Sequence, residues 1–270
     1  MSSFTHGRLT MAIHRYGDGP LPLIAIHGFD RSGRDFVVLA EALANRCTFH
    51  AFDLPFHGHS PSPAGEGPIT PEEFAAFFVA YTQHIGGGPM ALLGYSLGGR
   101  LALSLVEQCP ALWSKAFLVA PDGLVPQPWY RGMANYRWGR WVYRKFIDHP
   151  GGIHALIAML YRTRLIGDRM HRFLMGHSDT RKARLLLHEV WTSFRLIEPD
   201  LQRVADNLRS QAMPLHLFMG EHDRVIRPTQ AKRLQQLAPE QVHVQVMHTG
   251  HRMLTVELGE AIAKALKSQS

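Results

Sequence analysis

The stretch MALLGYSLGGR, residues 90–100, decides how this chain folds. Residues 90–95 form an apolar run typical of a buried strand, and the residues from Leu97 onward have helical spacing that ends before Pro110. Between them, Ser96 sits in a Gly-x-Ser-x-Gly pattern, in which the small residues avoid a clash at a sharp strand-to-helix turn. A hydroxyl at such a turn stands beside a helix N-terminus that favours negative charge. The pattern predicts a nucleophile at Ser96.

Apolar runs alternate with helical patterns on both sides of this stretch. Thr70, Pro71 and Glu73 add a helix start with a capping threonine and a capping-box glutamate. Continuous apolar strands joined by helices predict an α/β fold, with a mostly parallel central sheet and helices on both faces. The runs lie at 21–26, 47–52, 115–120, 215–219 and 242–247, and the helical patterns at 32–44, 97–108, 229–238 and 253–267.

The alternation stops after residue 121 and resumes near residue 212. The sequence therefore predicts a core made of residues 1–121 and 212–270, with a helical insertion of residues 122–211. The two parts differ in net charge. The chain has 29 Lys+Arg and 22 Asp+Glu, a net of +7, and the insertion holds 15 of the Lys+Arg residues and 8 of the Asp+Glu residues. The whole positive excess lies in the insertion.

A serine nucleophile needs a general base, and the base needs an acid that orients it. Asp223 lies just after the apolar run 215–219, and His251 lies just after the run 242–247. A fold with this nucleophile turn is expected to place the acid at the end of a later strand and the histidine after the last strand, so we predict that Asp223 and His251 act with Ser96. Asp122, at the end of the run 115–120, is the alternative acid, although Pro-Asp-Gly also predicts a turn there.

The polar residues that end other strands have simpler interpretations. Glu221 and Asp53 are predicted to be surface and turn groups. His57 and His59 suggest a metal, but no third ligand accompanies them at suitable spacing, so no metal site is predicted. The chain has no phosphate-binding glycine loop, and no cofactor is expected.

These motifs together resemble the α/β-hydrolase superfamily from Leu9 to Leu266. The order of nucleophile, acid and base is that of the family. Residues 27–30, His-Gly-Phe-Asp, are similar to its oxyanion loop, and residues 53–60 to its Asp-x-x-Gly-x-Gly-x-Ser turn, with Phe56 in place of the first glycine. The resemblance implies an oxyanion hole formed by the backbone N–H groups of Phe29 and Leu97, with His27 holding the loop.

Three residues are candidates for substrate contact: Tyr95, Arg100 and His27. The elbow with Tyr95 and Arg100 is similar to that of menaquinone-pathway enzymes that expel pyruvate, in which the matching positions line the site. An ion pair within the protein is the competing interpretation for Arg100. The resemblance to those enzymes leaves a carbon–carbon lyase as an alternative activity, beside carbon–carbon hydrolysis of the kind that meta-cleavage-product hydrolases perform.

The insertion corresponds to the cap that selects substrates in this family. It contains four of the five Trp residues of the chain, interleaved with arginines. Three interpretations stay open: the arginines form a solvated face, one of them points inward to bind a carboxylate, or the basic aromatic cap binds an acidic surface such as anionic lipid. Single-stranded nucleic acid is not expected, because no nucleic-acid motif is present. The crowded stretch includes Trp129, Tyr130, Arg131, Tyr136, Arg137, Trp138, Arg140, Trp141, Tyr143 and Arg144, and Trp191 follows later.

Cysteine use and the N-terminus bear on the cellular location. Cys47 and Cys109 lie in apolar stretches and are expected to be buried small residues rather than a disulfide framework. Neither a signal peptide nor a run of about 18 apolar residues is found, so a cytoplasmic protein without an integral membrane segment is predicted.

The sequence as a whole predicts a serine hydrolase of carboxylic esters or related small acyl compounds, anionic ones among them. It would act through an acyl-enzyme on Ser96. A non-catalytic small-molecule receptor on the same scaffold is the alternative of another class.

Overall fold

Eight strands form one sheet in the computed structural model, which describes residues 1–125, 134–168, 171, 175–176 and 178–267. The strand order is β1-β2-β4-β3-β5-β6-β7-β8; β1 pairs with β2 and β2 with β4 in antiparallel fashion, and the other neighbours are parallel. The mostly parallel central sheet predicted from the sequence is confirmed. The strands are β1 Ser2–His6, β2 Leu9–Tyr16, β3 Leu21–Ile26, β4 Cys47–Phe52, β5 Met90–Tyr95, β6 Trp113–Val119, β7 Leu215–Gly220 and β8 Val242–Met247.

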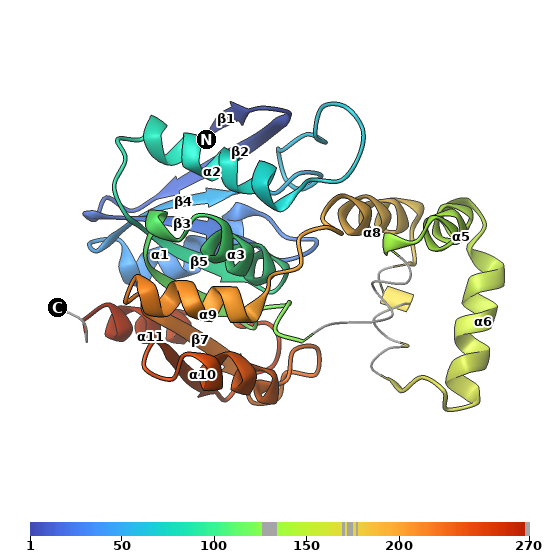
Figure 1. The fold of residues 1–270 in the computed structure, drawn as a ribbon. Coiled ribbons are helices and arrows are strands. Elements are labelled where there is room, and N and C mark those ends of the chain that lie inside the picture. The colour runs from blue at the N-terminus through green and yellow to red at the C-terminus, as the bar shows by residue number, and fades with distance from the viewer. Residues whose placement is uncertain (126–133, 169–170, 172–174, 177, 268–270) are drawn as a thin grey trace. The chain divides into compact units, whose positions relative to one another are not determined.

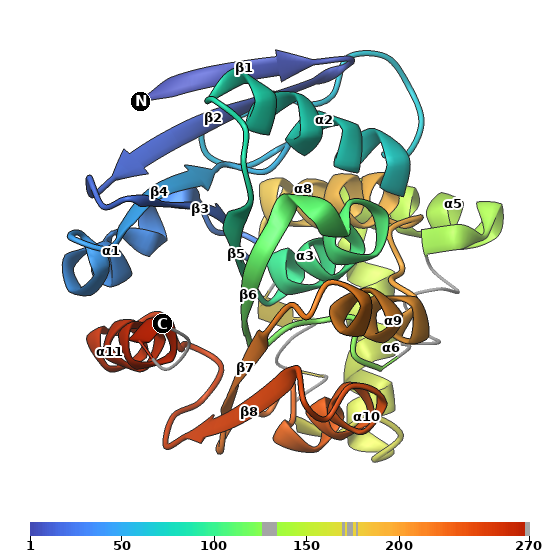
Figure 2. The same cartoon turned by 60° about the vertical axis from the view of Figure 1, so that its left-hand side comes forward.

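Helices cover both faces of this sheet, with α1 and α11 on one side and α2, α3, α9 and α10 on the other (Figure 2). Because of this cover, every residue of the central strands β4 and β5 is buried, and the sequence of β5 is accordingly apolar throughout. The two polar residues of β4 form hydrogen bonds, Thr48 Oγ1 with Gly19 O and His50 Nδ1 with the Tyr81 hydroxyl. The helices are α1 Val37–Leu43, α2 Pro71–His84, α3 Leu97–Gln108, α5 Arg137–Asp148, α6 Pro150–Arg162, α8 Arg181–Ser193, α9 Leu201–Ser210, α10 Lys232–Leu237 and α11 Val256–Lys267. Short 3-10 turns are η1 Gly33–Phe36, η2 Pro110–Leu112 and η3 Pro228–Ala231.

The start of α2 has the predicted capping box. Thr70 Oγ1 accepts a hydrogen bond from Glu73 N at 3.1 Å, and the Glu73 carboxylate accepts one from Thr70 N at 3.4 Å, with Pro71 in the first turn. Other helices are shorter than their apolar patterns predicted. The patterns 32–44 and 229–238 each begin with a 3-10 turn, η1 and η3, and become α-helix only at Val37 and Lys232.

The N-terminal hairpin of β1 and β2 was not predicted from the sequence. Leu9, Met11 and Ile13 of β2 are buried against the sheet, whereas β1 is largely exposed at its edge. Gly7 makes the turn between them with a φ of +58°, which a glycine adopts without strain. The hairpin is short, and its exposed strand lacks the apolar run by which the inner strands were recognised.

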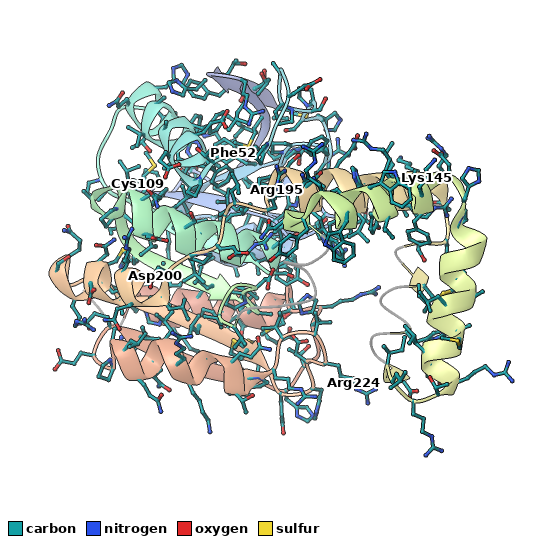
Figure 3. All side chains as sticks on the ribbon, turned by 45° about the vertical axis from the view of Figure 1, so that its right-hand side comes forward. Phe52, Cys109, Lys145, Arg195, Asp200 and Arg224 are labelled. Carbon is teal, nitrogen blue, oxygen red and sulfur yellow. The ribbon has the colours of Figure 1, made fainter. Side chains whose placement is uncertain are left out.

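The chain forms two compact units with different boundaries from the predicted ones. The larger unit contains residues 1–125 and 197–270, and the smaller unit contains residues 126–196 (Figure 1). Residues 197–211, predicted to belong to the insertion, are part of the larger unit because α9 packs on α3. Asn207 Nδ2 donates to the carbonyl oxygens of Val106 and Glu107 at 3.0 and 2.9 Å, and Asp200, labelled in Figure 3, caps the N-terminus of α9.

The corrected boundary sharpens the separation of charge. The smaller unit holds 13 Lys+Arg and 4 Asp+Glu, a net of +9, and the larger unit holds 16 and 18, a net of −2. Within the smaller unit, α5 packs on α8 through buried Tyr143, Phe146, Leu187 and Val190. Trp129, Tyr130 and Arg131 of the predicted basic aromatic stretch lie outside the described residues.

The sequence also gave rise to predictions about the two cysteines and about membrane-spanning helices. Cys47 is buried as predicted, but Cys109 is only partly buried; burial raises the pKa of the two thiols to about 11 and about 12. Within the part of the chain that the structure describes, no helix has both the length and the apolar character needed to cross a bilayer.

Candidate active site

Ser96 lies at the turn between β5 and α3 in a strained backbone conformation. Its φ is +53° and its ψ is −114°, values that a residue with a side chain rarely adopts. Backbone hydrogen bonds hold the turn: Ser96 N donates to Val119 O at 3.0 Å, and Ser96 O accepts from Asp122 N at 2.9 Å. These hydrogen bonds maintain the strained conformation. The turn therefore presents the hydroxyl of Ser96 at the carboxyl end of the sheet, as the Gly-x-Ser-x-Gly pattern predicted.

The glycines around Ser96 are required by close contacts. A Cβ on Gly98 would lie 2.0 Å from the carbonyl oxygen of Ile26 in β3, and one on Gly94 would lie 2.6 Å from Gly98 O. Both distances are far below van der Waals contact, so a larger residue at either position would push the strand and helix apart. The motif is therefore a packing requirement of the turn.

Ser96, His251 and Asp223 form one hydrogen-bonded chain. Ser96 Oγ lies 3.1 Å from His251 Nε2, and His251 Nδ1 lies 2.7 Å from Asp223 Oδ2. The other carboxylate oxygen, Asp223 Oδ1, accepts hydrogen bonds from the backbone N–H groups of Val225 and Ile226 at 2.7 and 2.9 Å. The acid is buried and fixed, and the histidine is oriented so that Nε2 can accept the serine proton.

Asp122, the alternative acid, does not join this chain. Its carboxylate lies 3.7 Å from Arg100 Nε, and its other oxygen accepts from Gly123 N at 2.8 Å, as the Pro-Asp-Gly turn predicted. Arg100 is buried, with 6% of its surface exposed. Arg100 thus has the ion pair within the protein that was the competing interpretation for this residue.

The loop after β3 lies against the nucleophile. A Cβ on Gly28 would approach Ser96 Cβ at 3.2 Å, so the backbone around Gly28 and Phe29 passes directly beside Ser96. Leu97 is the first residue of α3, where the N–H has no acceptor within the helix. The two predicted oxyanion donors, Phe29 N and Leu97 N, thus belong to segments that flank the serine.

His27 is a structural residue of this loop and not a substrate contact, which corrects one of its two predicted roles. It is fully buried; its Nδ1 lies 2.6 Å from Gly28 O, and its Nε2 lies 2.9 Å from Leu54 N. Burial lowers the pKa of His27 to about 3, so the ring is neutral, with Nδ1 donating and Nε2 accepting. It ties the loop after β3 to the end of β4.

His57 holds the same loop from the other side, a role that the sequence did not reveal. Its Nε2 accepts from Asp30 N at 3.1 Å and its Nδ1 donates to Pro55 O at 2.9 Å. Burial lowers the pKa of His57, in keeping with a neutral ring. The sequence shows that His57 lies in the 53–60 turn, but only the fold brings that turn to the loop after β3. Phe56 adopts a φ of +69° where the family pattern has glycine.

Asp53, predicted to be a turn group at the surface, is fully buried and anchors several segments. Its carboxylate accepts hydrogen bonds from Gly33 N at 2.7 Å and His59 N at 2.8 Å, and lies 3.1 Å from His14 Nε2. Burial acts to raise the pKa of Asp53, but these hydrogen bonds outweigh it and lower the pKa overall. Asp53 thus stays ionised as the centre of the turn.

Tyr95 also has a different role from the predicted one. The side chain is buried, and its hydroxyl donates to the backbone carbonyl of His251 at 2.8 Å. The two rings are 5.6 Å apart between centroids. Tyr95 therefore supports the loop that carries the base, and only the tertiary fold could show this, because 156 positions separate the two residues.

Comparisons with known proteins identify the family of this chain. The model of the Alpha/beta hydrolase family matches residues 23–265, about nine-tenths of the chain. The chain is 24% identical to the uncharacterized hydrolase YugF of Bacillus subtilis, with 88% of this chain and 86% of that protein covered. It is 26% identical to the pimeloyl-[acyl-carrier protein] methyl ester esterase of Stenotrophomonas maltophilia, with 89% of each covered.

Among solved structures, the chain is similar to a thermophilic esterase from Thermogutta terrifontis. The TM-score is 0.68 at 20% identity, with 96% of this chain and 94% of that chain covered. At this identity the structural likeness establishes the fold.

Proposed function

The chain belongs to the alpha/beta hydrolase family, and from that premise we propose that it hydrolyses carboxylic esters or related small acyl compounds through an acyl-enzyme on Ser96. The observation that carries the proposal is the hydrogen-bonded chain from Ser96 Oγ through His251 to Asp223. Relatives that cover most of the chain at low identity are hydrolases and esterases, which supports an ester as the substrate.

In the first half of the reaction, Ser96 Oγ attacks the ester carbonyl while its proton passes to His251 Nε2. Asp223 Oδ2 accepts from Nδ1–H and stabilises the imidazolium that forms. Negative charge on the carbonyl oxygen is stabilised by Phe29 N–H and Leu97 N–H, and such donors contribute about 2.7–4 kcal/mol each. The alcohol leaves with the proton of Nε2, and the acyl group stays on Ser96.

In the second half, a water molecule replaces the alcohol. His251 Nε2 accepts one proton of the water, whose oxygen attacks the acyl carbon. Collapse of the intermediate breaks the bond to Ser96 Oγ, which regains its proton from Nε2. The products are a carboxylic acid and an enzyme ready for the next ester.

The smaller unit, by this proposal, is the cap that selects the substrate, and its charge favours an anionic ester. Its net of +9 cannot be neutralised by its own four acidic residues. The Stenotrophomonas relative is named for a pimeloyl-[acyl-carrier protein] methyl ester, which supports a carboxylic ester as the bond that is cleaved. Arg100, whose position favoured lyase chemistry, lies 3.7 Å from the carboxylate of Asp122, which supports its interpretation as an ion-pair partner within the protein.

A panel of p-nitrophenyl esters tests the proposal, with one carboxylate-bearing ester matched in length to a neutral one. We expect turnover by the wild type, its loss in Ser96→Ala, and a preference for the anionic ester that salt weakens. Labelling by a fluorophosphonate distinguishes an enzyme from a receptor, because only an activated serine reacts. Absence of labelling at Ser96, or full activity of Ser96→Ala, would contradict the proposal. Equal rates for both esters would reject the anionic substrate only.

A further inference from the structure

A cluster of three polar side chains lies just beyond the carboxyl ends of β7 and β8, outside the Ser96–His251–Asp223 chain. We propose that Glu221, His222 and His248 form a binding site for a divalent transition-metal ion of the Zn²⁺ type. Each of the three offers a ligand atom, and these atoms all lie within 4.8 Å of one another. His248 Nδ1 lies 2.8 Å from Glu221 Oε2, and the His222 and His248 rings are 4.6 Å apart between centroids.

The backbone holds these side chains together without help from an ion. Strands β7 and β8 pair up to Gly220 and Met247. Beyond that point, Glu221 N donates to Met247 O at 2.8 Å and His222 N to Thr249 O at 2.9 Å. The two loops are thus fixed to each other, so that binding an ion requires only small side-chain rotations. Little conformational entropy is lost, which favours binding at an exposed site.

The donor set selects the class of ion. Two imidazole nitrogens and one carboxylate oxygen suit Zn²⁺, Ni²⁺ and Cu²⁺, whereas Mg²⁺ and Ca²⁺ prefer oxygen ligands alone. Three protein ligands leave a fourth position of a tetrahedral Zn²⁺ ion to water. All three residues are exposed, so an ion reaches them directly from solvent. The hydrogen bond between His248 and Glu221 would be replaced by bonds from both residues to the ion.

A second cluster, His14, Asp53 and His59, differs from this one because hydrogen bonds within the protein already use its carboxylate. There the carboxylate of Asp53 is fully buried and already accepts two backbone hydrogen bonds, and Gly58 packs against it. An ion would have to displace these bonds to reach the oxygens. That cluster is part of the turn structure, and the proposal is confined to Glu221, His222 and His248.

Isothermal titration of the full chain with ZnCl₂ tests the site, after removal of metal by EDTA and of any polyhistidine tag. We expect one ion to bind per chain, and affinity to fall at least about tenfold in His222→Gln and in His248→Gln. The chain has 17 histidines, so His6→Gln, a change of another exposed histidine in β1, is the matched control and should bind as the wild type does. MgCl₂ should give no binding at the same concentrations.

The catalytic histidine provides the second comparison. His251→Gln should keep Zn²⁺ binding, and the double variant of His222 and His248 should keep ester hydrolysis in metal-free buffer. The proposal is overturned if the wild type binds no Zn²⁺, or if the double variant, folded by circular dichroism, binds it with unchanged affinity. It is also overturned if His251→Gln abolishes binding, because the ion would then occupy the Ser96 site. None of these three binding results depends on whether the protein is an esterase.

Discussion

The two units of this protein treat positive charge differently. In the larger unit basic and acidic residues nearly balance, and its buried Arg100 lies beside the carboxylate of Asp122. In the smaller unit 13 basic residues face only four acidic ones, and its buried Arg184 donates to the backbone carbonyls of Ile147 and Ser178. The charges of the larger unit thus nearly cancel, whereas the smaller unit keeps a large positive net charge.

The units also differ in how they fix their side chains. In the larger unit, strand ends and tight turns place polar groups to within hydrogen-bond distance, as at Ser96 and His251. In the smaller unit, helices pack through apolar faces and leave large side chains such as Trp138 and Trp141 exposed. The candidate catalytic residues Ser96, Asp223 and His251 all belong to the larger unit, so we expect substitutions there to have the larger effects.

The largest expected effect is that of Asp223→Asn. The amide would keep an oxygen for Val225 N–H and Ile226 N–H but would favour the wrong tautomer of His251, so we expect kcat to fall by about 10⁴-fold. The matched control is Asp122→Asn, which should keep kcat within a few-fold. Steady-state kinetics on a p-nitrophenyl ester measures both. If Asp122→Asn gives the greater loss, the acid has been assigned to the wrong strand.

Next in size is a pair of glycine substitutions, one in each unit. Gly98→Ala places a Cβ 2.0 Å from Ile26 O and should lower the free energy of unfolding by about 3 kcal/mol, the upper range for overpacking. Gly152→Ala in α6 meets no atom within 4 Å and should raise helix stability by about 0.5–1 kcal/mol. Urea denaturation followed by circular dichroism measures both changes. If both substitutions changed the free energy of unfolding in the same direction, the expected difference between the two units would be wrong.

Low pH should reduce the free energy of unfolding of the larger unit, because His27 is buried and neutral there. The pKa of His27 is about 3 in the folded protein and about 6.5 in an unfolded chain. Because the unfolded chain alone takes up this proton, the contribution is fully present above pH 6.5 and is lost as the pH falls toward 3. The cost at pH 5 is about 2 kcal/mol.

Urea unfolding at pH 7 and pH 5 tests this linkage. His27→Gln cannot titrate, so its loss of stability between the two pH values should be smaller than that of the wild type by about 2 kcal/mol. His6→Gln, at an exposed position, should show the wild-type loss. Equal losses in the wild type and in His27→Gln would show that this histidine is not the acid-sensitive group.

The smallest expected effect is that of Tyr95→Phe. Loss of the hydrogen bond to His251 O should lower kcat about fivefold, which corresponds to about 1 kcal/mol, with little change in KM. Tyr81→Phe is the control, because the Tyr81 hydroxyl bonds to His50 instead; it should reduce stability without changing kcat. A rise in KM with constant kcat would make Tyr95 a substrate contact after all.

The sequence predicted those parts of the fold that depend on local pattern. The runs at 21–26, 47–52 and 90–95 form strands that are mostly buried and mostly apolar, because helices cover both faces of the sheet. The antiparallel hairpin of residues 2–16 was missed, since its outer strand is exposed and carries no such run. The end of the insertion was misplaced, because nothing local shows that the amphipathic helix α9 packs on α3.

For the candidate site, the sequence alone predicted Ser96, Asp223 and His251 as a set, because a Gly-x-Ser-x-Gly turn and polar residues at later strand ends can be read from pattern and their chain order is that of the family. Only the tertiary structure decided the roles of their neighbours. Tyr95 and His27 turned out to support loops, Arg100 to pair with Asp122, and Asp53 to be buried. The physical reason is that a side chain's partners are often more than 20 positions away along the chain, where burial and hydrogen bonding depend on the packing of the whole molecule.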